Sequence, residues 1–167
     1  EKDANEIFER EIPNLLNLDR NNMKINGDKY EVCDLLSKSK KFIHIKWWDS
    51  SATLSHLFAQ GRVSAETIMR NEEQRNKVNA EITKINPDFE NIIVRDNYLP
   101  ENYTVVYGII YMEDKHIVQR LPFFSKVNLM HSVQKLREMR YKVEIAHIKS
   151  TCKRLKKGQQ QMKMALA

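Results

Sequence analysis

The chain has 167 residues, of which 41% are hydrophobic and 30% are charged, so it has enough apolar material for one core. Lys and Arg outnumber Asp and Glu by 28 to 22, which gives a formal charge of +6 and favours a polyanionic partner such as nucleic acid. Its longest apolar runs have about half of the ~20 residues that a membrane span requires. We expect a cytoplasmic protein with one domain over residues 1–150 and a basic, Gln-rich tail over residues 151–167.

The first third of the sequence predicts a helix followed by a hairpin. Apolar residues recur at helical spacing over residues 5–18, and Pro13 is expected to interrupt that helix. Asn26-Gly27-Asp28 is a strong turn signal before a strand that starts at Tyr30. A second strand, residues 41–48, follows a short Ser/Lys turn, so the two strands are expected to pair.

The rest of the chain predicts two helices and two or three further strands. Ser50-Ser51 can cap a helix in which apolar residues recur up to Met69, and residues 71–100 read as a long charged connection. The apolar run TVVYGIIYM, residues 104–112, predicts a strand buried on both faces, and residues 117–121 suit a short strand. Ser125 can cap a further helix, and alternating residues predict a last strand over residues 141–148.

The hairpin carries an unusual pair of charged residues, Asp34 on its first strand and Lys46 on its second. If the turn centres on Ser39, Asp34 lies opposite His44, and the acid, the histidine and the lysine share one face of the sheet. If the pairing slips by one residue, Glu31 pairs with Lys46 and becomes the better acid. Both registers place a carboxylate beside the lysine.

The predicted order, α-β-β-α-β-α-β, resembles the restriction-endonuclease-like core of the PD-(D/E)XK superfamily, an α/β fold with a mixed central sheet flanked by helices. In that superfamily the acid lies on the second strand and a D/E-x-K tripeptide on the third. Asp34 would be the acid and His44-Ile45-Lys46 the tripeptide, and FIHIKWW is similar to the Mrr-like branch, in which a Gln-x-Lys replaces the acidic version. SHLFAQG and LPFFSKVNL also resemble the C-terminal part of a sporadically distributed bacterial family of unassigned function.

The resemblance implies a divalent cation, Mg²⁺ or Mn²⁺, that polarises a phosphodiester and activates water. Asp34 and the backbone carbonyl of Ile45 would hold the ion, together with Glu9, or with Glu6 one helical turn earlier. Lys46 would orient the nucleophile or stabilise the charge on phosphate. His44 replaces an acid that Mg²⁺ prefers, and imidazole suits Mn²⁺ better or serves as a base near neutral pH.

These residues predict a metal-dependent endonuclease that acts on DNA rather than RNA, in defence against foreign DNA. His56 and Gln60, four residues apart on one helix, are candidate substrate contacts. The alternative is a catalytically degenerate module of the same fold that binds nucleic acid or regulates. We also expect a part of a longer polypeptide, a possible homodimer, and core positions for Phe123-Phe124 and at least one of Trp47 and Trp48. Further candidate phosphate contacts are the basic tail residues Lys153, Arg154, Lys156 and Lys157.

Overall fold

The computed structural model describes residues 2–19, 23–25, 28–112 and 117–150, which form an α+β fold around a mixed, open sheet of five strands. The five strands lie side by side in the order in which they occur in the chain. They are β1 (Leu15–Asn17), β4 (Leu35–Ser37), β5 (Lys41–Trp47), β6 (Thr104–Tyr111) and β7 (Lys142–Lys149). Two further strands, β2 (Met23–Ile25) and β3 (Asp28–Tyr30), pair antiparallel outside this sheet.

The sheet has an antiparallel half and a parallel half that meet at β5. β4 runs antiparallel to both β1 and β5, whereas β5, β6 and β7 are parallel to one another. Parallel strands require crossover connections, and helices supply both of them here. β6 is buried along nearly its whole length because its two faces are covered, which explains its continuous apolar sequence.

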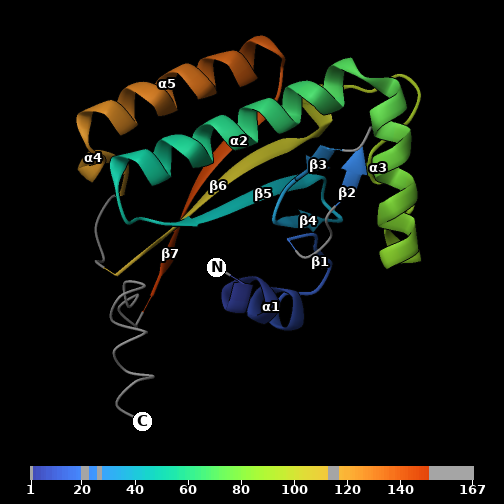
Figure 1. Ribbon diagram of the computed structural model, residues 1–167, viewed down its shortest axis with the longest axis horizontal. Coiled ribbons are helices and arrows are strands. Elements are labelled where there is room, and N and C mark those ends of the chain that lie inside the picture. Colours follow the sequence, from blue (N-terminus) through green and yellow to red (C-terminus); the bar gives the residue numbers. More distant parts are fainter. Residues whose placement is uncertain (1, 20–22, 26–27, 113–116, 151–167) are drawn as a thin grey trace.

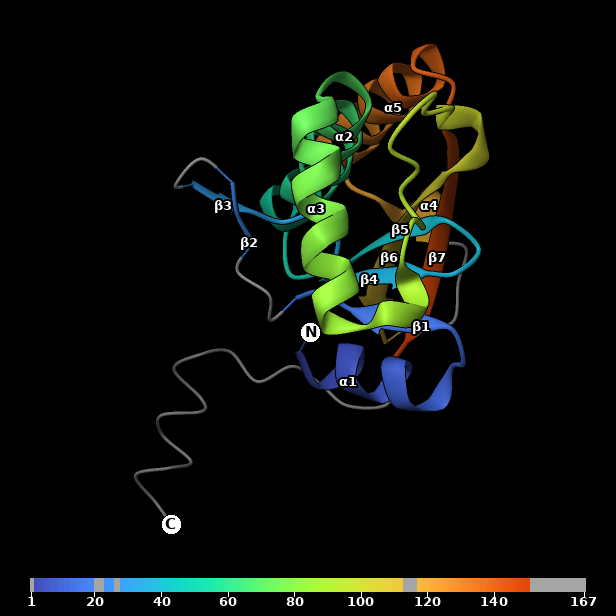
Figure 2. The ribbon, with the colours of Figure 1, turned by 90° about the vertical axis from the view of Figure 1, so that its right-hand side faces the viewer.

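Helices cover both faces of the sheet (Figures 1 and 2). α2 and α5 lie along one face, where they enclose the larger hydrophobic core, and α1 covers the other face with Ala4 and Phe8 packed against a smaller core. α3 stands at the end of α2 and leads into a connection that returns to β6 (Figure 1). The helices are α1 (Lys2–Glu11), α2 (Ser51–Arg70), α3 (Glu72–Ile85), α4 (Ile117–Arg120) and α5 (Phe123–Glu138), with short 3-10 helices η1 (Pro87–Phe89) and η2 (Pro100–Asn102).

Several predicted elements are confirmed. The turn of the hairpin centres on Ser39, because Leu35 pairs with Ile43 and Leu36 with Phe42. α2 begins as predicted, with the Ser50 side chain accepting a hydrogen bond from the amide of Thr53. β6, α5 and β7 also occur where apolar periodicity predicted them.

Other predictions were wrong. The first hairpin strand does not run from Tyr30, because residues 28–30 belong to the separate β2–β3 pair and regular pairing with β5 begins only at Leu35. Residues 117–120 form a helix with Ile117 buried and the next three residues exposed, which is not the alternation of a strand. α5 begins at Phe123, before the predicted cap.

The predicted charged connection after residue 71 contains the 14-residue helix α3. Its buried side chains recur at helical spacing, but two of the four are the polar residues Arg75 and Asn79. The Arg75 guanidinium donates hydrogen bonds to the carbonyl oxygens of Ile68, Met69 and Arg95. Arg75 therefore ties the end of α2 to the connection, and the polar character of the sequence concealed an interior helix face.

Candidate functional site

Asp34 lies directly before β4 and bonds to both neighbouring strands. Its backbone carbonyl accepts from the amide of Leu18, 2.9 Å away, at the end of β1. Its backbone amide donates to the Ile43 carbonyl at 3.0 Å, and its Oδ2 accepts from the Ile45 amide at 2.6 Å. The short carboxylate bond is charge-assisted, and it fixes the Asp34 side chain against the middle of β5.

The Asp34 carboxylate bonds to β5 at the position where a longer β4 would otherwise pair with it. On β5 the backbone groups of even-numbered residues face β6, as the Trp48 amide to Ile110 carbonyl bond indicates. The odd-numbered groups face β4, and regular pairing there ends at Ile43. Since the N–H and C=O of one strand residue point to the same neighbour, the Ile45 carbonyl lies on the side where Asp34 bonds the Ile45 amide. Two oxygen donors, one carboxylate and one carbonyl, thus lie on the same side of one residue.

Lys46 and His44 share the α2 face of β5. Phe42, two residues before His44, belongs to the core beneath α2, whereas Ile43, Ile45 and Trp47 pack on the α1 side. The register centred on Ser39 excludes the one-residue slip. Of the three residues predicted to share one face, the histidine and the lysine do so, whereas the Asp34 carboxylate accepts a hydrogen bond from the Ile45 backbone amide. Lys46 is half-buried there, two residues beyond His44.

α2 supports the segment that carries the acids. Gln60 donates from Nε2 to Oε2 of Glu31 at 2.8 Å, and the buried Ser64 hydroxyl donates to the carbonyl of Val32. Both bonds fix residues 31–34, which have no strand conformation, against the helix. Of the two predicted helix residues, Gln60 contacts the acid segment, and His56 is exposed one turn earlier. Ser64 carried no recognisable signal, because a lone helix serine is usually a surface residue.

His44 is fully buried, and neither ring nitrogen has a hydrogen-bond partner within the part of the chain that the structure describes. The pKa of His44 is lowered to about 4, chiefly because burial disfavours the charged ring and also because of the nearby Lys46 charge, while the Glu31 carboxylate acts in the opposite direction. The ring lies beneath α2 at Gly61, where an added Cβ would be 3.1 Å from His44 Cδ2 and 2.6 Å from Tyr107 Cε1. His44 is therefore a neutral interior group whose pKa depends on the nearby charges of Lys46 and Glu31.

The Glu9 carboxylate bonds to β1 rather than to the Asp34 arrangement. Glu9 Oε1 accepts from the amide of Asn17 at 2.9 Å. Since Leu18 donates to Asp34 across the β1–β4 pair, the Asn17 amide faces the open edge of the sheet. Glu9 thereby satisfies an edge donor of β1. Glu6 is exposed on the same helix, and the predicted tail contacts Lys153, Arg154, Lys156 and Lys157 lie outside the described residues.

The aromatic residues differ from expectation in one respect. Trp48 packs on Tyr111, with ring centroids 4.4 Å apart, and Trp47 is half-buried against the smaller core. Phe123 and Phe124, expected in the core, are each 72% exposed.

A family model described as a family of unknown function, DUF6119, matches residues 1–149. The chain belongs to this family. No curated protein and no solved structure matches the chain. For this member of DUF6119, the geometry of the residues is therefore the basis for assigning chemistry.

Within the described part of this DUF6119 chain, no group of three or more His, Cys, Asp or Glu side chains is arranged to hold a metal ion. A cation at Asp34 would therefore depend on a mixed set of donors, namely the carboxylate, the Ile45 carbonyl and water, a set that suits Mg²⁺. No helix among the described residues is both long and apolar enough to cross a bilayer.

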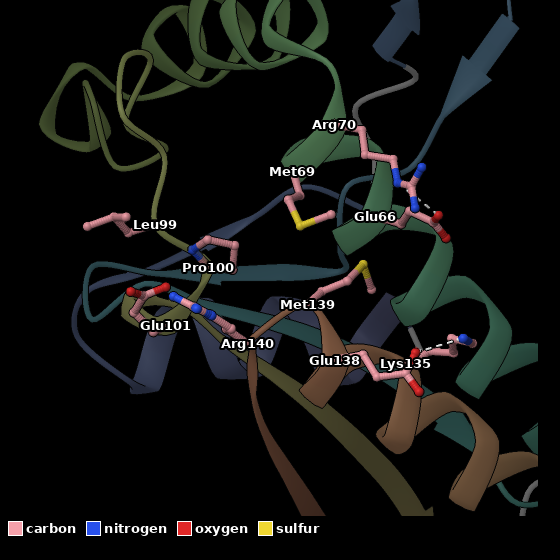
Figure 3. A pocket seen from close by; sticks show the side chains of 10 residues that line it. All are labelled: Glu66, Met69, Arg70, Leu99, Pro100, Glu101, Lys135, Glu138, Met139 and Arg140. Carbon is pink, nitrogen blue, oxygen red and sulfur yellow. Dashed lines mark hydrogen bonds and ion pairs between the residues drawn. The ribbon is translucent and has the colours of Figure 1, made fainter.

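A pocket of about 510 Å³ lies elsewhere, between the C-terminal ends of α2 and α5 and η2 (Figure 3). Met69 and Met139 lie in its wall, and its charged groups include the ion pairs Arg70–Glu66 and Lys135–Glu138. Among the residues predicted for phosphodiester chemistry, none of those that the structure describes lines this pocket. The pocket and the Asp34 arrangement are separate features of the fold.

Proposed function

We propose that the chain is a divalent-metal-dependent endonuclease that hydrolyses phosphodiester bonds in DNA. The observation that carries the proposal is the 2.6 Å bond from the Ile45 amide to Asp34 Oδ2. That bond holds an acid beside the central residue of His44-Ile45-Lys46. An acid, a backbone carbonyl and a lysine are the groups that such chemistry requires at one place.

The sheet supports the proposal independently of the bond. Among the five strands in spatial order, Asp34 lies directly before the second and His44-Ile45-Lys46 lies on the third. This is the placement that the resemblance to the PD-(D/E)XK superfamily implies. The mixed sheet between helix layers agrees with the same restriction-endonuclease-like core.

The chain's own residues have distinct roles in this proposal. Asp34 and the Ile45 carbonyl would hold Mg²⁺ or Mn²⁺, which when bound polarises the phosphate and lowers the pKa of a water. Lys46 supplies positive charge for the phosphate oxygens. Glu31, held by Gln60, is the second acid of the site, and neutral His44 lies behind them in the core rather than in contact with the substrate.

Plasmid cleavage in Mg²⁺ or Mn²⁺ tests the proposal. Asp34→Asn retains a side-chain oxygen for the Ile45 amide but removes the charge, and Lys46→Gln removes the cation. We expect each to reduce cleavage at least about 100-fold, because loss of one charge-stabilising group costs about 2.7–4 kcal/mol in the transition state. Asp96→Asn and Lys84→Gln, exposed positions, are the matched controls. Cleavage unchanged in Asp34→Asn, or absent from the wild-type protein with every metal, would reject the assignment.

The second candidate is a nucleic-acid-binding module without catalysis. His44 favours it, because the position that holds an acid in the resemblance is occupied here by a buried, neutral ring. This module would bind DNA equally with and without metal, and Asp34→Asn would bind as tightly as wild type. Binding should also weaken steeply with salt, since phosphate contacts release counterions.

A further inference from the structure

We infer that Phe123 and Phe124 form a stacking platform for unpaired bases, so that the substrate is DNA with a single-stranded segment. This inference rests on the proposed function for the identity of the strand, but the platform itself rests on separate observations. The two side chains are each 72% exposed at the start of α5, and their rings pack edge to face with centroids 5.5 Å apart. Such exposure of adjacent aromatic rings leaves ring surface open for contact with a partner.

The platform is held rigidly beside the start of α2. The Ser125 hydroxyl, fully buried, lies 2.8 Å from the Ser51 hydroxyl, and Asn128 Nδ2 donates to the Ser55 hydroxyl at 2.7 Å. The first turns of α2 and α5 are thereby joined, and the two helices lie side by side (Figure 1). Four residues separate Lys46 from Ser51, so the chain itself connects the proposed site to the platform.

The charge of the surrounding segment fits a polyanion. From Ile117 to Lys126, around the two rings, the sequence contains two cations, Arg120 and Lys126, and no Asp or Glu. Arg120 and Lys126 flank the two rings in sequence, and Lys126 Nζ donates to the Gln119 carbonyl at 2.8 Å, across the turn between α4 and α5. Aromatic rings among cations are the combination that single-strand binding requires, since the rings stack on bases and the cations contact phosphates.

The shape of the apolar surface favours a nucleic-acid strand over a bilayer. Beyond Phe124 the exposed face of α5 is polar apart from Met130, with Asn128, His131 and Gln134 on it. A helix that lies in a membrane interface has a continuous apolar face. An apolar tip of two rings suits the stacking of one or two bases.

Fluorescence anisotropy with a labelled oligothymidylate of about 15 nucleotides tests the platform without metal, in a chain carrying Asp34→Asn to prevent cleavage. Replacing both rings with Leu should weaken binding at least about tenfold, whereas replacing both with Tyr should change it less than about twofold, because only Tyr stacks. Met130→Ser is the matched control, as an exposed apolar residue of the same helix. Equal affinity of the Leu and Tyr variants would overturn the inference.

Two other occupants give different results. If the rings insert into a membrane, wild type but not the doubly Ser-substituted chain would sediment with vesicles of mixed phosphatidylserine and phosphatidylcholine, and the Leu variant would still sediment. If they contact a second copy, sedimentation velocity would detect a dimer that the Ser variant loses. Either result, with oligonucleotide binding unchanged, would overturn the inference. If the oligonucleotide binds through the two rings but the protein does not cleave plasmid, only the endonuclease proposal is rejected. If the protein cleaves plasmid but binds the oligonucleotide equally well without the rings, only the platform is rejected.

Discussion

The two flanks of β5 are built differently. On one side, seven consecutive residues of β5 pair with β6 in a regular parallel ladder. On the other side, β4 pairs with β5 at two positions, and the next contacts come from the backbone and the carboxylate of Asp34. The β6 flank is a continuous, buried ladder. On the β4 flank the ladder stops at Ile43, and the Asp34 carboxylate bonds to the next outward-facing amide, that of Ile45.

The difference shows how a fold can hold an acid without a strand to carry it. A carboxylate that meets a strand amide gains a charge-assisted bond, and here it does so beyond the start of β4, between β1 and β5. Because β6 is buried along nearly its whole length, we expect the regular flank to contribute more to stability than the irregular one.

The largest expected effect is on the regular flank. Ile109 is fully buried in β6, so Ile109→Ala removes core volume and should lower the free energy of unfolding by about 2–5 kcal/mol. Urea denaturation measures this change. Val63→Ala, at an exposed site of α2, is the control and should change stability by less than about 0.5 kcal/mol. A loss below that limit for Ile109→Ala would show that β6 is not this buried ladder.

The second expected effect concerns His44 and pH. Its pKa is about 4 in the folded chain and about 6.5 when unfolded, so the unfolded state binds the proton more readily between these values. Stability should therefore be highest above pH 6.5 and decline as pH falls toward 4, by up to about 3 kcal/mol. In His44→Leu, the free energy of unfolding should no longer show this decrease when urea denaturation is measured at several pH values from 7 to 4.5. Exposed His56→Gln should keep it, and an identical acid-side slope in all three proteins would contradict the burial of a neutral ring.

The sequence predicted the regular flank better than the irregular one. The strand TVVYGIIYM and the turn at Ser39 follow from apolar runs and period-two pairing, which are local signals. Asp34 and Lys46 were found as a pair because a charged residue in an apolar strand is conspicuous. The hydrogen bond from the Ile45 amide was not predictable, because it forms where the strand stops and pattern reasoning assumes that the strand continues.

The remaining differences also have physical causes. The interior side of α3 contains Arg75 and Asn79, whose polar groups bond to backbone carbonyls, so the helix showed little apolar periodicity. Phe123 and Phe124 were expected in the core because aromatic residues usually are, but burial depends on helix orientation that sequence alone does not specify. The bond from the Asn17 amide to Glu9 could not be predicted, because it depends on which amide of β1 faces the open edge of the sheet.

The third expected effect is at the helix that covers both flanks. Gly61→Ala would place a Cβ 2.6 Å from Tyr107 Cε1 and 3.1 Å from His44 Cδ2, so the helix must move or the rings must shift. Overpacking should outweigh the helix propensity gained from Ala, for a net loss of about 1–2 kcal/mol in urea denaturation. The matched control, exposed Ala59→Gly in the same helix, should lose about 1 kcal/mol from propensity alone. Increased stability of Gly61→Ala would mean that α2 does not approach β5 and β6 so closely.

The smallest expected effect separates the structural role of Asp34 from its proposed chemistry. Asp34→Asn keeps an oxygen for the Ile45 amide but loses charge assistance, so it should cost only about 1 kcal/mol. Asp34→Ala leaves the Ile45 amide without this acceptor, and its hydrogen exchange should be faster in Ala than in Asn. If Asp34→Asn keeps slow exchange at the Ile45 amide but loses cleavage, catalysis depends on the Asp34 charge and the position of β5 depends on the side-chain oxygen. Equally fast exchange in both variants would show that the irregular flank depends on the charge itself, and cleavage loss in Asn would then follow from a displaced β5.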